Sequence, residues 1–225
     1  MPTLPARPFQ WRHFQFFNRD EVEEPPACFQ GDEGGRLTHL KSLDAQGKLV
    51  TLGEDANANG TPTARIWSLR KTTPDGHPML LKAVSVQQSS SNSSKTPYPV
   101  TAFDVLDNLT QMAIGFADGR VVVVRGQLIK DRSSKQRTVW SGEEAVTGLA
   151  LCERNNMVHL YVTTLSKTVV CNTTTNKEHQ LVIDEHGCAV GCVALNAGTG
   201  DLVLGREEAI FSYTPDGRGP CYAFE

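Results

Sequence analysis

Several features common in other protein classes are absent from this sequence. No run of 18 apolar residues occurs, so no transmembrane helix is expected. The first 17 residues lack the continuous apolar segment of a secretory signal. Six cysteines among 225 residues, with no C-x₂-C pair, do not make a disulfide scaffold. We therefore expect reduced thiols and a cytoplasmic protein.

Motifs that would indicate an enzyme or a nucleotide-binding protein are also missing. There is no G-x-S-x-G nucleophile elbow and no phosphate-binding loop after a strand, and Gly31–Gly35 opens no helix. The formal net charge is only −3, which gives no strong attraction to nucleic acid or anionic lipid. These absences favour a binding module over an enzyme.

What is present is a β-meander between Pro99 and Gly126. Val100–Leu106 alternates between two faces, Gln111–Ala117 is mostly apolar, and Val121–Val124 is a β-branched run typical of a strand covered on both sides. Asp107-Asn108 and Asp118-Gly119 supply the turns, and both residues of the second pair tolerate positive φ. The stretch therefore predicts three antiparallel strands.

Similar units recur along the chain. They begin at Leu37, Val100, Val146 and Gly191, so the last two intervals are 46 and 45 residues, whereas the first is 63. Such a period with three or four strands per unit is typical of WD40-like blades, and Ala64-Arg65-Ile66-Trp67 lies where such repeats carry a tryptophan. The blade units are predicted near residues 37–87, 99–141, 145–184 and 189–225.

The predicted fold class is accordingly all-β: an incomplete WD40-like β-propeller of about four blades, spanning residues 9–225, with an extra N-terminal strand. That strand is the aromatic stretch Phe9–Phe17, and residues 1–8 are proline-rich and expected to be disordered. Residues 87–98 form a Ser/Asn-rich, low-complexity loop that accounts for the long first interval.

His186, Cys188 and Cys192 form a candidate zinc site. Three such ligands within seven residues could bind zinc, but a fourth ligand is not obvious. Cys192, like Cys152 and Cys171, lies in an apolar strand run where cysteine packs as a small apolar side chain, and Cys221 is predicted to pack beside a turn. We assign no metal, catalytic or cofactor-binding residue and expect no cofactor.

Two other residue groups leave alternatives open. His39, His159 and His186 fall in different units, so their convergence into a hydrolase site stays a remote alternative. Calcium binding is conceivable at the acidic, Asn-rich loop, although the EF-hand pattern is absent and a polar blade loop is the better interpretation. The acidic and amide side chains of that loop are Glu54, Asp55, Asn57 and Asn59.

A locally basic stretch lies between the second and third units, from Gly126 to Trp140. It could bind an acidic partner or a phosphoinositide, but it lacks the aromatic residues of nucleic-acid surfaces, so a solvated loop between blades is favoured. Its cations, counted from the residue before it, are Arg125, Lys130, Arg132, Lys135 and Arg137.

Long irregular strings in the chain resemble one family. They include FQWRHFQFF, LGEDANANGTPTARIWSL, QMAIGFADGRVVVVRGQLIKDRSSK, AVTGLAL, DEHGCAVGCVAL and YTPDGRGPCYAFE. In order and approximate spacing they are similar to the N-terminal propeller region of the vacuolar protein sorting-associated protein 11 family. The strings extend over most of the chain from Phe9 to Glu225 and do not depend on general WD40 consensus residues.

The resemblance implies a non-catalytic subunit of the HOPS and CORVET membrane-tethering complexes. It implies vesicle-mediated protein transport, docking and fusion of endosomes with lysosomes, and autophagosome fusion. Partners would be the other subunits and, through the complex, SNAREs or Rab GTPases. The location would be cytoplasmic, peripheral on late endosomal, lysosomal or vacuolar membranes. A WD40-like adaptor unrelated to membrane traffic is the alternative.

The family continues into an α-solenoid and a RING zinc domain, and neither matches any residue of this chain. Most of the family's first blade is also missing between Pro25 and Leu37. A fragment, an alternative transcript or an incomplete gene model would each explain both gaps. About four blades would leave apolar faces exposed, so we expect poor solubility or dependence on a partner when the chain is expressed alone. A compact four-bladed closure is the alternative.

Overall fold

The described part of the chain consists almost entirely of β-strands. A computed structural model describes residues 36–55, 59–88, 97–130, 134–174, 180–207 and 209–223. Within these ranges the one helical element is the short 3₁₀ helix η1, Asp44–Gln46, between the first two strands. No helix in the described ranges has the length and apolar character that crossing a membrane requires.

The strands form four antiparallel sheets, each made of four strands that are consecutive in sequence. Sheet 1 contains β1 (Arg36–Leu43), β2 (Lys48–Asp55), β3 (Thr61–Thr72) and β4 (Pro78–Ser85). Sheet 2 contains β5 (Val100–Val105), β6 (Gln111–Phe116), β7 (Arg120–Arg125) and β8 (Lys135–Ser141). Sheet 3 contains β9 (Gly148–Arg154), β10 (Met157–Thr163), β11 (Thr168–Asn172) and β12 (Gln180–Asp184). Sheet 4 contains β13 (Val193–Asn196), β14 (Asp201–Arg206), β15 (Ala209–Thr214) and β16 (Gly217–Ala223).

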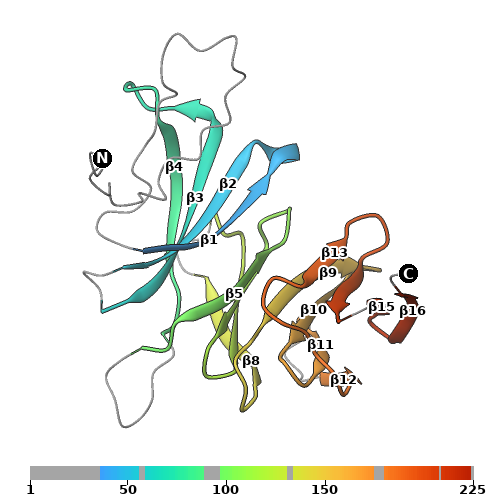
Figure 1. Cartoon of the computed structure of the whole chain (residues 1–225). Coiled ribbons are helices and arrows are strands. Elements are labelled where there is room, and N and C mark those ends of the chain that lie inside the picture. The colour runs from blue at the N-terminus through green and yellow to red at the C-terminus, as the bar shows by residue number, and fades with distance from the viewer. Residues whose placement is uncertain are drawn as a thin grey trace, which may run out of the picture.

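The four sheets follow one another along an open arc (Figure 1). The first strands β1, β5, β9 and β13 contact one another in succession, so they form the inner edge of the arc. This arrangement of meanders is that of an incomplete β-propeller, and it confirms the fold class predicted from the repeats. The four-bladed closure is wrong, because sheets 1 and 4 stand at opposite ends and no described core joins them.

Three apolar cores lie between neighbouring sheets. The first joins sheets 1 and 2, the second joins sheets 2 and 3, and the third joins sheets 3 and 4. Strand β7 contributes to two of them, since Val122 and Val124 pack against sheet 1 and Val121 and Val123 pack toward sheet 3. A β-branched strand without a polar face was predicted here, and its cause is the presence of a sheet on each side.

The turns of sheet 2 follow the sequence signals with one difference. β5, β6 and β7 occupy the three predicted strand segments. In the turn between β6 and β7, however, Gly119 has positive φ (83°) and Asp118 does not. The Asp118 carboxylate instead accepts a hydrogen bond from the Arg120 amide at 3.1 Å. The glycine is needed because a Cβ there would approach the carbonyl oxygen of Gly142 to 2.5 Å.

Some predictions fall outside the described residues. These are the disordered segment 1–8, the extra strand Phe9–Phe17 and most of the Ser/Asn-rich loop 87–98. The Gly31–Gly35 stretch also lies outside them.

Candidate functional site

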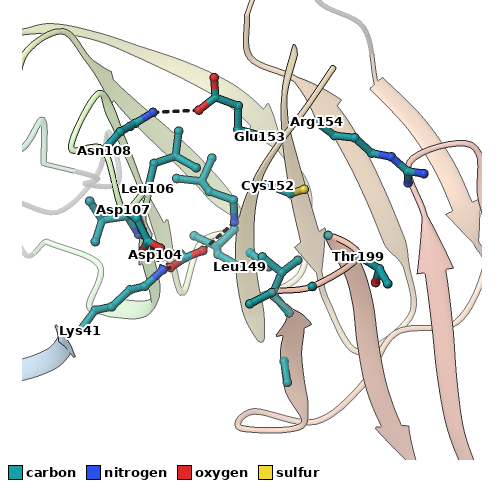
Figure 2. A pocket seen from close by; sticks show the side chains of 18 of the residues that line it. Lys41, Asp104, Leu106, Asp107, Asn108, Leu149, Cys152, Glu153, Arg154 and Thr199 are labelled. Carbon is teal, nitrogen blue, oxygen red and sulfur yellow. Dashed lines mark hydrogen bonds and ion pairs between the residues drawn. The ribbon is translucent and has the colours of Figure 1, made fainter. Parts of the chain in front are cut away.

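A groove of about 920 Å³ runs along the inner edge of the arc. Figure 2 shows it between sheet 2, sheet 3 and sheet 4, with Lys41 reaching in from sheet 1. Apolar side chains and Asp104 line it, and its rim carries polar side chains from the ends of the inner strands and the turns that follow them. The rim residues are Asp107, Asn108, Glu153, Arg154, Asn155 and Thr199.

Asp104, on the inner strand β5, is the central polar residue of this groove. Its Oδ1 accepts hydrogen bonds from the Lys41 ammonium at 2.7 Å and from the Val105 amide at 2.9 Å. Its Oδ2 accepts one from the Leu151 amide of β9 at 2.6 Å. Lys41 also donates to the Val105 carbonyl oxygen at 2.7 Å. The buried carboxylate therefore holds sheets 1, 2 and 3 together at their inner edge.

Polar contacts also connect the turns on the groove rim. The Asn108 amide donates to a Glu153 carboxylate oxygen at 2.8 Å, which links the β5–β6 turn to the end of β9. Arg154 lies 3.7 Å from the Asp201 carboxylate and links sheet 3 to sheet 4. Both pairs are partly exposed, so each contributes little stability.

The groove offers hydrogen bonds and charge for binding. Cys152 is its one lining thiol, and burial raises the pKa of that thiol, which is therefore protonated at neutral pH. The carboxylates of Asp104 and Glu153 both have hydrogen-bonding partners within the fold.

A second polar cluster, which is partly buried, connects sheet 3 to sheet 4. Tyr213 donates its hydroxyl hydrogen to Asp184 Oδ2 at 2.5 Å, and Arg206 Nη1 lies 3.2 Å from the same oxygen. Asp184 Oδ1 accepts from the His186 amide at 3.0 Å and lies 3.1 Å from its ring Nδ1. The Arg206 guanidinium also packs over the Phe211 ring, 4.7 Å from its centroid.

The ionisation of this cluster follows from those contacts. Burial raises the pKa of Asp184, but the hydrogen bonds from Tyr213 and His186 and the charge of Arg206 outweigh it and lower the pKa to about 2. Burial, together with the hydrogen bond to Asp184, raises the pKa of Tyr213 to about 12. The carboxylate is thus charged and the phenol neutral across the physiological range.

The cysteine and histidine residues considered for zinc lie in different environments. Cys188 is buried, Cys192 is exposed, and His186 contacts Asp184. Among the described residues no group of three or more His, Cys, Asp or Glu side chains could hold a metal ion. The expectation that Cys192 is buried in a strand is wrong, because it precedes β13 and is exposed.

The remaining cysteines divide in the same way. Cys152 and Cys171 are buried, as predicted, and burial raises the pKa of Cys171 to about 12. Cys221 is exposed, so its prediction as a packing residue is wrong. It lies on β16, the outermost strand of sheet 4.

The other histidines belong to separate sheets. His39 lies on β1, with its ring centroid 6.4 Å from that of Phe103, and burial lowers its pKa. His159 lies on β10, and burial lowers its pKa as well. His186 follows β12 and contacts Asp184, so the three rings have different neighbours.

The basic stretch and the acidic loop both support the fold. Arg125 donates to the Thr174 carbonyl oxygen at 2.9 Å, and Arg137 donates to that of Thr173 at 3.5 Å. These two arginines therefore connect sheet 2 to sheet 3. Glu54 accepts a hydrogen bond from the Val100 amide at 2.9 Å, so it joins sheet 1 to sheet 2. Arg132 and Asn57 lie outside the described residues.

Sequence reasoning did not identify the groove or Asp104. The donors to Asp104 lie 63 and 47 residues away in the chain, at Lys41 and Leu151. The available signal was one charged residue on the otherwise apolar inward face of a predicted strand, with Ala102 and Leu106 on either side.

Comparison with known proteins gives a consistent family signal. The family model described as PEP5/VPS11 N-terminal matches residues 26–225. Vacuolar protein sorting-associated protein 11 homologs from human and mouse are each 35% identical over 193 residues, which is 84% of this chain and 20% of the relative. The Dictyostelium discoideum homolog is 27% identical over 192 residues. The chain thus spans about a fifth of the length of these curated relatives.

One solved structure shares the fold. The computationally designed Ika8 protein matches with a TM-score of 0.52 and 18% identity, over 84% of this chain and 49% of that chain. At that identity the likeness concerns the fold alone.

Proposed function

Because the chain belongs to the PEP5/VPS11 N-terminal family, we propose that it is a non-catalytic interaction scaffold in vacuolar protein sorting. The observation that carries this proposal is the family match over residues 26–225. Within that role the inner groove is the binding surface. The Asn108–Glu153 and Arg154–Asp201 pairs connect neighbouring sheets at its rim, so a partner would meet polar side chains from sheets 2, 3 and 4.

The finer assignment is a subunit of the HOPS and CORVET tethering complexes. In that role the chain contributes to the docking and fusion of endosomes with lysosomes and to autophagosome fusion. Its direct partners are other subunits, and it reaches SNAREs or Rab GTPases through the complex. It is cytoplasmic and associates with late endosomal, lysosomal or vacuolar membranes through those partners.

The test is proximity labelling in cells with the 225-residue chain fused to a labelling enzyme. We expect endosomal and lysosomal tethering proteins among the labelled partners. A double variant, Asp107→Arg with Glu153→Arg, reverses two exposed charges on the groove rim and is expected to lose at least about tenfold of that labelling.

The matched control is Glu143→Arg with Glu185→Arg. Both positions are exposed and lie outside the groove, and the change in net charge is the same. Equal loss in both double variants would contradict binding in the groove. Recovery of nuclear or ribosomal partners without endosomal ones would contradict the sorting role and favour a general adaptor.

A further inference from the structure

We propose that the inner groove binds an extended segment of a partner protein, in which a short apolar stretch is flanked by lysine or arginine. The main chain of that segment pairs with the open edge of β13, and one of its cations lies beside Asp107 and Glu153. The chemistry of this occupant goes beyond the proposed function and rests on it in one respect, which is that the groove is the binding surface.

The backbone edges of β5 and β9 are already in use beside Asp104. Both are terminal strands of their sheets, so each has one edge without a strand partner. On β5 the Val105 amide donates to Asp104 Oδ1 at 2.9 Å, and the Val105 carbonyl oxygen accepts from Lys41 at 2.7 Å. On β9 the Leu151 amide donates to Asp104 Oδ2 at 2.6 Å. These backbone groups are therefore not available to the main chain of a ligand.

The edge of β13 differs, because its groove side carries no such contact. The Cys192 carbonyl oxygen accepts from the Gly205 amide at 3.0 Å, so this position directs its backbone toward β14. Backbone direction alternates along an antiparallel strand, so Val193 and Leu195 direct their N–H and C=O groups away from β14. Both residues line the groove, and within the described ranges the sheet order places no strand on that side. An extended chain can add there as a strand.

The wall around β13 has room for a second chain because its side chains are small. Gly200 must be glycine, since a Cβ there would lie 2.5 Å from the Cys152 sulfur. The groove volume of about 920 Å³ lies in the range of roughly 300–1,000 Å³ that is typical of ligand sites, which suits a short segment. The small residues of this wall are Ala150, Ala194, Ala197, Gly198 and Gly200.

The groove rim carries negative charge that favours a cationic partner. Asp107 and Glu153 are both exposed, and in the described part of the chain neither is paired with a cation. The other charged lining residues have oppositely charged partners within the fold. Asn108 follows Asp107 and donates to Glu153 at 2.8 Å, so the two carboxylates stand on either side of one amide (Figure 2). A lysine or arginine next to the apolar stretch would complement this pair.

The test is the binding of a fluorescein-labelled peptide, Lys-Leu-Val-Leu-Lys, to the 225-residue chain fused to a soluble carrier protein. We expect saturable binding by fluorescence polarisation that weakens as salt is added. The peptide Glu-Leu-Val-Leu-Glu should bind at least about tenfold more weakly, because its charges meet carboxylates. A version of the lysine peptide with methylated backbone nitrogens keeps the side chains but cannot donate to β13, and it should also lose at least about tenfold.

Variants of the chain place the contact in the groove. Asp107→Asn with Glu153→Gln removes both rim charges at constant shape and should weaken lysine-peptide binding at least about tenfold. The matched control is Glu143→Gln with Glu185→Gln, since both positions are exposed and lie outside the groove. Circular dichroism shows that each variant is folded. Bound peptide should also slow amide hydrogen exchange in β13 and leave β16, at the other edge of sheet 4, unchanged.

Four results would overturn the proposal. They are no binding of the lysine peptide, equal affinity for the glutamate peptide, equal affinity for the methylated peptide, and equal loss in the rim variant and its control.

The proposed function has a separate readout. Absence of peptide binding, with endosomal labelling still lost in the charge-reversed rim variant, overturns the peptide assignment and leaves the sorting role in place. Peptide binding with only nuclear or ribosomal labelling in cells supports the peptide assignment and contradicts the sorting role.

Discussion

At the scale of single residues, Asp104 connects three of the four sheets. Its buried carboxylate accepts hydrogen bonds from the Lys41 ammonium of sheet 1 and from the Leu151 amide of sheet 3, while its backbone belongs to sheet 2. Charge-assisted hydrogen bonds of this kind are stronger than neutral ones, and losing the acceptor leaves buried donors without a partner. The inner edge of the arc therefore depends on this side chain.

Replacing Asp104 by alanine should lower the free energy of unfolding by about 3 kcal/mol, because the buried Leu151 amide loses its acceptor and Lys41 keeps only the Val105 carbonyl oxygen. Urea unfolding followed by circular dichroism measures the change. Asp107→Ala is the control, since Asp107 is exposed and should change stability by less than about 0.5 kcal/mol. Equal effects of the two variants would contradict the role assigned to Asp104.

The Asp184 cluster predicts a dependence of stability on pH. The pKa of Asp184 is lowered in the folded state to about 2 from the ordinary value of 3.8. The stabilisation is therefore complete above about pH 4 and is lost as the pH falls through 2; it amounts to about 2 kcal/mol. Subtracting the stability of Asp184→Asn from that of the unchanged chain, at pH 2 to 7, isolates this contribution.

Tyr213→Phe provides an independent check, because it removes the hydroxyl that donates to Asp184. The acid transition should move to higher pH in this variant. The raised pKa of Tyr213 affects stability at the other end of the pH range. Its contribution to the free energy of unfolding is present below pH 10 and is lost as the pH rises toward 12. An unchanged acid transition in Tyr213→Phe would contradict the assigned hydrogen bond.

At the scale of the element, sheets 2 and 4 show why the burial of some residues could be predicted from the sequence and that of others could not. β6 and β7 are covered on both faces, so an apolar or β-branched run is sufficient to identify them. Burial at Cys192 and Cys221 depends instead on where each residue lies relative to sheet 4: Cys192 precedes β13, and Cys221 lies on the outermost strand β16. Nothing local in the sequence encodes those positions, so Cys192 is predicted to be buried in a strand and Cys221 to pack beside a turn, whereas both are exposed. The contacts of Asp104 were hidden for the same reason, since its donors belong to other sheets.

The connection between β12 and β13 contains the glycine with the least space. A Cβ on Gly187 would overlap the carbonyl oxygen of Thr164, and backbone atoms cannot move aside as a side chain can. We expect Gly187→Ala to destabilise the chain by about 2 kcal/mol or more. Gly198→Ala is the matched control, because the nearest atom would lie 3.4 Å away. Thermal unfolding of both variants measures the difference, and similar melting temperatures would contradict the tight contact.

At the scale of the whole molecule, the sheets differ in how many neighbours they have. Sheets 2 and 3 pack on both faces, whereas sheets 1 and 4 each join a single described core. All six residues of β6 are buried, while β13 has none that is fully buried. Stability in repeat architectures is a sum of terms within sheets and between neighbours, so the middle of the arc should be the most stable part.

Amide hydrogen exchange measures that gradient directly. We expect the slowest exchange in β6 and β7 and faster exchange in sheet 4, with differences of about tenfold or more between them. A uniform exchange rate across the four sheets would show that they open only together. Fast exchange in β6 with slow exchange in β13 would contradict the packing described above.

Each sheet is formed by one contiguous stretch of chain, and every described strand pairs only with strands of its own sheet. A peptide bond can therefore be cut between two sheets without dividing any ladder of backbone hydrogen bonds. Two separately produced halves, divided between β8 and β9, would each retain complete hairpins. The apolar core between sheets 2 and 3, together with the hydrogen bonds that Asp104, Arg125 and Arg137 make to sheet 3, would rejoin them. The fold is therefore suitable for split-protein reconstitution and for the gain or loss of one repeat during evolution.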